Sequence, residues 1–272
     1  DERIFVASRS FLMPIVAGGL SDTTGVEMVS KDFEFFGKIS SAGTSEGHLT
    51  APSALAFDSE ENLYVADEYL NTVSVFDPEG VFLRSWGVKG KGDGEFDNPS
   101  GLLIIEDVVF VVDTMNHRIQ KYDLDGTYIE SWGSEGSDKL QLKYPWGITT
   151  GNSEDIYITD WGNDRISTFT KSGEHVGNIN SGIGSDKPLN RPAHAVLDNE
   201  GNMYVADWGN QILQVFMNLL KNSQESINDK IRNGNLKTNG LIQVNFYEKN
   251  SLKIVDIVDN GLGFPDSQLN DL

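Results

Sequence analysis

An internal repeat of about 47 residues constrains the fold more than any other feature of the sequence. Prolines recur at intervals of 47, 46 and 47 residues, at Pro52, Pro99, Pro145 and Pro192. Aspartates recur at intervals of 46, 47 and 47 residues, at Asp67, Asp113, Asp160 and Asp207. A repeat of this length is usually one supersecondary unit that cannot bury its apolar face alone. The chain must therefore build its core by stacking successive copies against one another.

Each copy reads as four short apolar stretches separated by turn residues. The second stretch ends in the recurrent aspartate and covers 63–67, 109–113, 156–160 and 203–207. A third stretch follows a turn, and Gly-containing hairpin turns at 77–80, 123–126 and 171–173 lead to a fourth. Four short strands in a unit of this length are typical of a propeller blade. The sequence predicts a mainly β fold, a partial β-propeller of four-stranded antiparallel blades.

The recurrent polar residues of the turns are interpreted as structural. The aspartate at the end of the second strand can accept backbone N–H groups of the turn that follows it. Asparagine tolerates the left-handed backbone of such turns, and it occurs there as Asn71, Asn116, Asn163 and Asn210. The alternative is a catalytic or calcium-binding role, but recurrence once in every copy favours a structural one.

Several stretches carry a more specific resemblance. Residues 99–126 contain Pro-Ser-Gly-Leu, then Phe-Val-Val-Asp-Thr-Met-Asn-His-Arg-Ile-Gln-Lys-Tyr, and end in Asp-Gly. Residues 156–169 and 203–216 contain Thr-Asp-Trp-Gly-Asn-Asp-Arg-Ile and Ala-Asp-Trp-Gly-Asn-Gln-Ile-Leu. This pattern resembles the NHL repeat, which usually forms propellers of six blades. The resemblance implies a partial blade in 1–46 and four repeats in 47–216, at 47–93, 94–137, 138–183 and 184–216.

After residue 216 the repeat stops and a different order of elements is predicted. A helix is expected over 217–227 and strands over 241–247 and 252–258, followed by Asp-Asn-Gly-Leu-Gly at 259–263. This order resembles the ATP-binding domain of sensor histidine kinases of the nitrogen-regulation type, which makes 217–272 a small α+β fragment of that domain. The resemblance implies a role in holding ATP and Mg²⁺ for Asn218, Asn222, Asp259, Gly261 and Gly263.

The kinase resemblance covers only part of such a domain. No phosphoacceptor-histidine domain precedes it, and its ATP lid and second glycine box are expected beyond residue 272. Phosphoryl transfer depends on positioning and charge stabilisation, so we expect weak ATP binding at most and no kinase activity. Residues 211–216 fit both the third strand of a blade and the start of the kinase helix. This overlap suggests the hypothesis that two truncated genes or sequence reads are joined there.

The formal charge of −20 lies almost entirely in the predicted propeller. Residues 1–216 carry 15 Lys and Arg against 34 Asp and Glu, a net charge of −19, and residues 217–272 carry 6 against 7, a net charge of −1. Such a charge repels nucleic acids and favours basic or cationic partners. The absence of cysteine excludes disulfides and thiolate sites, and no membrane segment is predicted. The kinase-like tail suggests the cytoplasm, whereas a propeller would also suit an extracytoplasmic site.

His194 is the candidate for metal chemistry. It lies two residues after Pro192, where other copies have Ala54, Gly101 and Gly147, and is expected at the start of an innermost strand. In amidating-lyase relatives with this propeller, histidines at such places bind zinc. A zinc site needs three or four ligands, and the other histidines are predicted not to converge with it: His48, His117 and His175. A polar residue that lines the channel is the alternative.

The preferred function is a non-catalytic scaffold for protein or ligand binding, because loops on a rigid framework are good places for recognition. One alternative is an ATP-binding signalling protein related to sensor histidine kinases, and another is a metal-dependent propeller lyase or lactonase. No Gly-x-Ser-x-Gly, His-Glu-x-x-His or Walker loop occurs. The tryptophans are interpreted first as blade packing and second as exposed ligand contacts: Trp86, Trp132, Trp146, Trp161 and Trp208.

Overall fold

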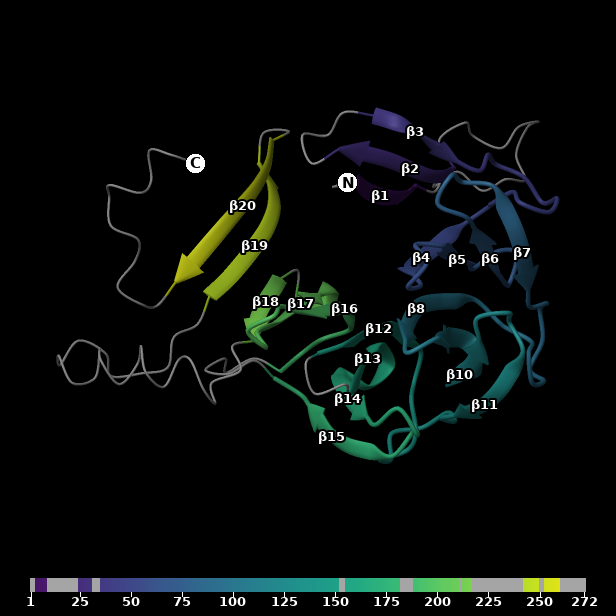
Figure 1. The fold of residues 1–272 in the computed structure, drawn as a ribbon. Helices are drawn as coiled ribbons and strands as arrows, with labels where there is room; N and C mark the ends of the chain where they lie inside the picture. Colours follow the sequence, from purple (N-terminus) through teal and green to yellow (C-terminus); the bar gives the residue numbers. More distant parts are fainter. Residues whose placement is uncertain are drawn as a thin grey trace, which may run out of the picture. The chain divides into compact units, whose positions relative to one another are not determined.

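The strands of this chain form antiparallel sheets that follow one another along the sequence (Figure 1). The computed structural model describes residues 3–8, 24–30, 35–151, 155–181, 188–210, 212–216, 242–249 and 252–259. The predicted mainly β fold class and its four-stranded antiparallel blades are confirmed. The chain divides into two compact units, Asp1–Gly147 and Ile148–Leu272.

The first unit contains one three-stranded sheet and two four-stranded sheets. The three-stranded sheet consists of β1 (Arg3–Ser8), β2 (Gly25–Ser30) and β3 (Phe35–Ile39). The next sheet consists of β4 (Pro52–Phe57), β5 (Leu63–Asp67), β6 (Thr72–Phe76) and β7 (Phe82–Trp86). The third consists of β8 (Pro99–Ile105), β9 (Val108–Asp113), β10 (Arg118–Asp123) and β11 (Tyr128–Trp132).

The second unit continues the same pattern. One sheet contains β12 (Pro145–Thr150), which begins before the boundary, β13 (Ile156–Asp160), β14 (Arg165–Phe169) and β15 (His175–Ile179). The last sheet begins with β16 (Pro192–Leu197), β17 (Met203–Asp207) and β18 (Ile212–Phe216). A single turn of 3-10 helix follows β9, β13 and β17, as η1 (Thr114–Asn116), η2 (Trp161–Asn163) and η3 (Trp208–Asn210).

Two further strands lie in the C-terminal segment, close to the predicted 241–247 and 252–258. They are β19 (Ile242–Lys249) and β20 (Leu252–Asp259), which pair as an antiparallel hairpin. β19 also pairs with β18, so that the last sheet has five strands. The helix predicted over 217–227 lies outside the described residues, and the predicted domain boundary at residue 217 stays a prediction.

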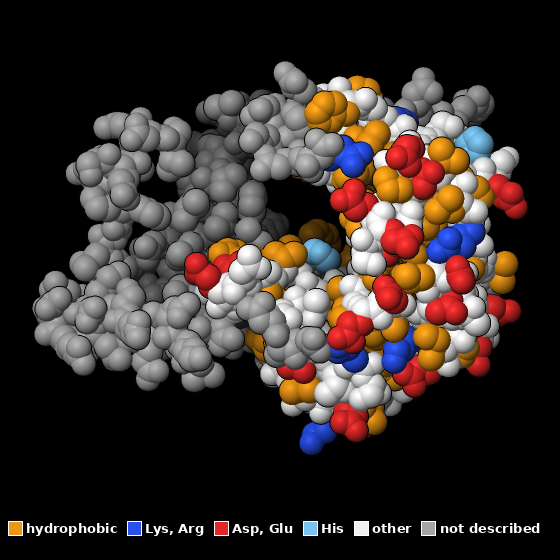
Figure 2. All heavy atoms as spheres, in the orientation of Figure 1, with side chains coloured by type: hydrophobic (Ala, Val, Ile, Leu, Met, Phe, Trp, Pro, Cys, Tyr) orange, Lys and Arg blue, Asp and Glu red, His pale blue; other side chains and the backbone are white. Residues whose placement is uncertain are grey.

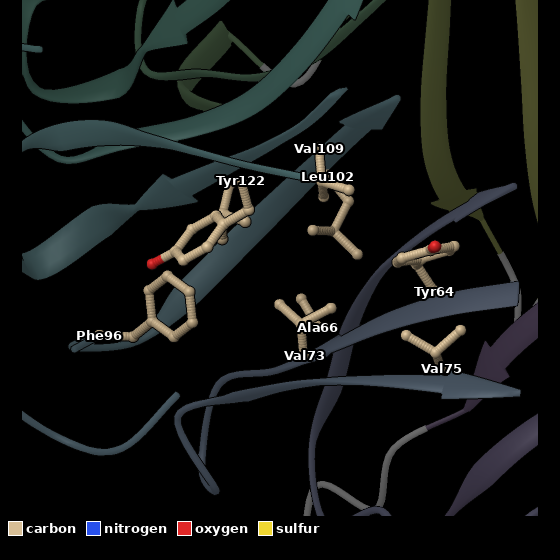
Figure 3. Packing of buried hydrophobic residues seen from close by; sticks show 9 residues of the cluster. Tyr64, Ala66, Val73, Val75, Phe96, Leu102, Val109 and Tyr122 are labelled. Atoms are coloured by element: carbon tan, nitrogen blue, oxygen red, sulfur yellow. The ribbon is translucent and has the colours of Figure 1, made fainter. Parts of the chain in front are cut away.

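Neighbouring sheets of the first unit bury their facing side chains against each other (Figure 3). One cluster brings together Tyr64, Ala66, Val73, Val75, Phe96, Leu102, Val109, Val111 and Tyr122. The other alternate residues of β5, Leu63 and Val65, pack instead with Val26 and Ile39 of the preceding sheet. Because side chains alternate along a strand, β5 serves two interfaces and is buried at every position. Each large apolar side chain so buried contributes roughly 1.5–3 kcal/mol.

Glycines in the turns between third and fourth strands make a second contact between sheets. A Cβ on Gly126 would come within 2.6 Å of the indole of Trp86 on β7. Gly80 faces Ile39 at the end of β3 in the same way, at 3.2 Å. Their φ angles are 87° and 83°. These turns therefore need glycine both for the backbone conformation and for the close approach.

We expect Gly126→Ala to lower the free energy of unfolding by about 2–4 kcal/mol, because the methyl group meets both a left-handed backbone and the ring of Trp86. Gly94 is the matched control, since its φ is 79° and nothing lies within 4 Å of a Cβ placed there. Gly94→Ala should cost only the backbone term, about 1 kcal/mol. Urea unfolding measures both losses, and equal losses would show that the contact with Trp86 does not hold the turn.

Candidate functional site

Each sheet carries loops at two opposite ends. The loop that leads into its first strand and the turn between its second and third strands lie at the same end, because successive strands are antiparallel. We call this the loop end of a sheet. The turns between first and second strands and between third and fourth strands form the opposite end. The recurrent aspartates and asparagines all lie at loop ends.

The aspartate at the end of the second strand ties the loop end together. The four side chains have no exposed surface: Asp67, Asp113, Asp160 and Asp207. One carboxylate oxygen of Asp67 accepts the backbone N–H groups of Thr50 and Ala51, at 2.6 and 2.9 Å. Its other oxygen accepts those of Tyr69 and Leu70, at 3.0 and 2.9 Å. The carboxylate therefore joins the incoming loop to the turn, with all its bonds made inside the protein.

Two of these carboxylates also form buried ion pairs. Arg118 donates from Nε to Asp113 at 2.8 Å, and Arg165 donates from Nε to Asp160 at 2.7 Å. The amide of Asn116 adds bonds to both oxygens of Asp113, at 3.1 and 2.9 Å. A buried carboxylate without such donors would be strongly destabilising. The side chains are therefore held in place and take part in the framework.

Asp207 differs from Asp113 and Asp160 because its copy has no arginine at the equivalent position. Ile212 occurs where those copies have Arg118 and Arg165. Asp207 accepts the backbone N–H of Asn190 and the side-chain amide of Asn210, both at 2.8 Å. Burial nevertheless raises the pKa of Asp207 above its ordinary value, and the charge of Asp164 adds to the rise. The hydrogen bonds from Asn190 and Asn210 oppose this effect without cancelling it.

The turn asparagines differ from the expectation in one respect. The left-handed residue is the fourth after the aspartate, and it is Asn71, His117 or Asp164, with φ of 59°, 58° and 55°. Asn71 is thus equivalent to His117, and not to Asn116 as the sequence suggested. Asn116, Asn163 and Asn210 lie one position earlier, where their amides donate to the aspartate. The closed turn imposes the left-handed backbone at this position, and asparagine, histidine and aspartate all occupy it.

The left-handed residue also makes a bond to the next sheet, which we call the hook. Its side chain accepts the backbone N–H of the residue 27 positions later, just before the proline of the next first strand. The pairs are Asn71 with Asn98 at 2.9 Å, His117 with Tyr144 at 3.0 Å, and Asp164 with Arg191 at 2.8 Å. The three donors have positive φ, at 56°, 49° and 53°. The hook thus stabilises a strained residue at the point where β8, β12 and β16 begin.

A cleft of about 440 Å³ opens at the loop end of the β8–β11 sheet. Its lining includes His117 and Tyr144, whose ring centroids lie 4.6 Å apart, together with Lys91, Arg118 and Glu135. Its size is within the range of small-molecule sites. The charge of Arg118 is already balanced by the ion pair with Asp113. The cleft is therefore polar but offers no strong net charge.

Exposed aromatic and sulfur-containing side chains lie one or two residues after three of the buried aspartates. Tyr69 is 51% exposed, Met115 46% and Trp208 61%. In the second unit the rings of Trp161 and Trp208 have centroids 6.4 Å apart and a tilt of 38°. The guanidinium carbon of Arg191 lies 5.0 Å from the centre of the Trp161 ring. We call Trp161, which is half-buried, and Trp208, which is exposed, the tryptophan pair.

The tryptophans were interpreted from the sequence as blade packing or as exposed ligand contacts, and the two interpretations apply to different positions. Trp86 packs with Tyr64 and Tyr122, at centroid distances of 6.2 and 5.7 Å. Trp132 packs with Phe110 at 5.9 Å. Tryptophans at the end of the fourth strand are therefore part of the packing between strands and sheets, whereas Trp208 lies in a turn and faces solvent.

The opposite end also uses its recurrent acids internally. Asp58 accepts the backbone N–H groups of Glu60 and Asn62, at 3.0 and 2.8 Å. Asp198 repeats this arrangement, and a bond from the side chain of Asn202 is the main cause that lowers its pKa. Burial, reinforced by the charge of Asp58, raises the pKa of Tyr64 to about 12. The phenol of Tyr64 therefore stays protonated at neutral pH.

His194 lies on β16 opposite Ala206, near the start of a first strand as expected. Its side chain is accessible to solvent, yet the protein around it desolvates the charged form and lowers the pKa of the imidazole. These properties are compatible, since an accessible group can still have protein on several sides. No group of three or more His, Asp or Glu side chains able to hold a metal occurs among the described residues. A metal role for His194 stays a prediction.

The remaining predicted site residues are placed as follows. His48 lies in the loop before β4, and His175 begins β15, where its ring is 3.1 Å from the amide oxygen of Asn178. Asp259 is the last residue of β20. The other predicted nucleotide-binding residues lie outside the described part of the chain: Asn218, Asn222, Gly261 and Gly263. The nucleotide site therefore stays a prediction.

Comparisons with known proteins agree with this architecture. A family profile described as "6-bladed beta-propeller" matches residues 43–132. A catalytically inactive histidine-to-alanine variant of virginiamycin B lyase from Staphylococcus aureus, solved with quinupristin, is 15% identical, with a TM-score of 0.54 over 71% of this chain and 60% of the lyase. The nidogen/laminin complex gives 18% identity and a TM-score of 0.55, over 71% of this chain and 67% of that one. A protein of unknown function from Bacteroides caccae gives 12% and 0.53, over 85% and 75%.

These likenesses define the class as a β-propeller built of repeated sheets. Identities of 18% or less show the fold alone, and the chain spans about 60% of the length of the lyases that it resembles. The predicted propeller is confirmed, and the comparisons give no support to the kinase resemblance. No curated protein matches the sequence. In the described part of the chain no helix is long and apolar enough to cross a membrane.

The hook at His117 can be tested by two substitutions. His117→Ala should lower the free energy of unfolding by about 1–2 kcal/mol, because the N–H of Tyr144 loses its acceptor and alanine is strained at this left-handed position. His117→Asn restores the arrangement found at Asn71 and should stay close to the wild-type stability. Urea unfolding and amide exchange at Tyr144 measure the effect. If both variants unfold at the same urea concentration, the hook contributes nothing.

Proposed function

We propose that this protein is a non-catalytic binding scaffold, a β-propeller of NHL type that recognises a protein or ligand through the loop ends of its sheets. One observation carries the proposal. At these ends the recurrent carboxylates are buried and fully hydrogen-bonded, whereas side chains next to them, such as Tyr69 and Trp208, are exposed. The loop ends therefore combine a rigid framework with accessible aromatic groups, which is the arrangement that recognition sites favour.

The same arrangement argues against catalysis by these acids. A general acid or base must reach the substrate, and the buried aspartates make their bonds within the framework. A metal-dependent lyase or lactonase would need three or four ligands around His194. The described residues offer no such group, so this alternative rests on likeness of fold, which several functions share.

The charge of the chain supports a basic or cationic partner. Residues 1–216 carry a net charge of −19, counted as 15 basic against 34 acidic side chains. On the face that Figure 2 shows, acidic side chains are scattered among hydrophobic ones, with few lysines and arginines. Complementary charge speeds association and disfavours partners of like charge, nucleic acids among them.

Site-specific photo-crosslinking tests which end of a sheet meets the partner. A crosslinking amino acid in place of Tyr69, at the loop end of the β4–β7 sheet, should give an adduct with a protein that carries a basic segment. The matched control replaces Val81, which is 59% exposed at the opposite end of the same sheet, and should give none. Adducts of equal yield at both positions, or at Val81 alone, would contradict the proposal.

The C-terminal segment carries the second function proposed from the sequence, ATP binding of the histidine-kinase type. Its support is the order of the two boxes and of the strands between them. Asp259, at the end of β20, is the residue that would bind the adenine amino group.

A labelled ATP analogue titrated against the whole chain tests this second function. Binding at micromolar concentration that is lost in Asp259→Asn would support it. The carboxylate has two acceptor oxygens for the adenine amino group, whereas the asparagine amide has only one. Asp256→Asn, on the same strand, is the matched control for charge. Absence of binding at millimolar ATP would remove the nucleotide function and leave the scaffold proposal untouched.

A further inference from the structure

We infer that the tryptophan pair, Trp161 and Trp208, is a docking site for a side-chain cation of a basic protein segment. The inference rests on the proposed scaffold function and specifies its chemistry. The occupant is the arginine or lysine side chains of an extended basic peptide, and the surface is formed by the turns after β13 and β17.

The turn framework does not require tryptophan. The position directly after the buried aspartate is Glu68 in the first copy and Thr114 in the second, and it is tryptophan only in the next two. Asp67 and Asp113 make their bonds to the incoming loop regardless of these residues. The exposed ring of Trp208 is therefore not explained by the packing of the turn.

The loop beside the pair holds its geometry fixed. Gly209 donates its N–H to the carbonyl of Asn190 at 2.8 Å, and a Cβ on Gly209 would come within 2.4 Å of the Asn190 side chain. The neighbouring residue, Arg191, is held by the hook from Asp164. The turn that carries Trp208 and the loop that carries Arg191 are thus tied together before any partner arrives, which lowers the entropy lost on binding.

The contact of Arg191 with Trp161 indicates that this surface binds cationic groups. The guanidinium carbon of Arg191 lies 5.0 Å from the centre of the Trp161 ring, a cation–π contact made within the chain. Among the described residues no cation lies over the ring of Trp208, which is 61% exposed. A second cation stacked on Trp208 would extend the arrangement that Arg191 begins. The net charge of −20 draws basic segments toward the protein.

Binding of an octa-arginine peptide, followed by tryptophan fluorescence at low ionic strength, tests the inference. Trp208→Ala should weaken binding about three- to tenfold, which is the effect of one cation–π contact. Trp208→Phe should lie between this variant and the wild type, since phenylalanine is the weaker ring. Val81→Ala, at the opposite end of a sheet in the other unit, should leave the affinity unchanged. Thermal unfolding confirms that each variant is folded.

Arg191→Ala separates a specific site from general attraction by charge. Removing this cation takes away one repulsive charge beside the pair, so binding should tighten about two- to fivefold. Lys171→Ala removes the same charge in the turn before β15, at the opposite end of its sheet, and should change the affinity less. Weaker binding in Arg191→Ala would overturn the inference and indicate an anionic ligand.

The outcomes also distinguish this inference from the scaffold proposal. If Trp208→Ala and Val81→Ala both bind octa-arginine like the wild type, the tryptophan pair is not the site, although the acidic scaffold still binds basic peptides. If octa-arginine does not bind, or octa-glutamate binds instead, the cationic occupant is wrong. The crosslinking at Tyr69 then decides separately whether the loop ends bind a partner at all.

Discussion

The fold depends on a carboxylate that is buried at the end of the second strand of each repeated sheet. A charge without exposed surface is costly unless donors surround it. The donors come from two places, the turn that follows the strand and the loop that precedes the first strand, some 17 residues earlier in the chain. One side chain thus fixes three segments at once. This geometry explains why the donor residue of the loop and the aspartate stay 16 or 17 residues apart in these copies.

The copies meet this requirement in different ways. Asp67 uses backbone N–H groups of the loop and turn, Asp113 and Asp160 add an arginine, and Asp207 relies on Asn190 and Asn210. Burial raises the pKa of Asp207, and the bonds from Asn190 and Asn210 oppose this rise. Asp67, Asp113 and Asp207 each bind the incoming loop to the sheet through this side chain. Loops held in this way can present side chains to a partner with little further loss of freedom.

Part of this architecture could be predicted from the sequence because its signals are local. The alternation within 63–67 and the spacing of the aspartates are enough to predict strands, turns and stacking. The left-handed position was missed because Asn71, His117 and Asp164 share a backbone conformation but no residue type. The hooks join residues 27 positions apart through one side-chain atom, and nothing in the intervening sequence marks the acceptor. Pairing of β19 with β18 likewise has no local signal.

Residues that every copy needs for folding differ from the side chains that single copies expose to solvent. A residue that every copy needs, such as the buried aspartate, is explained by folding, and its recurrence says nothing about a ligand. Trp161 and Trp208 occupy a position that Glu68 and Thr114 fill in copies with the same buried bonds. An exposed indole adds little to the stability of a turn, because most of its apolar surface stays in water. We infer that Trp208 contributes through contacts with a partner, and the guanidinium of Arg191 over the Trp161 ring favours a cation as that partner.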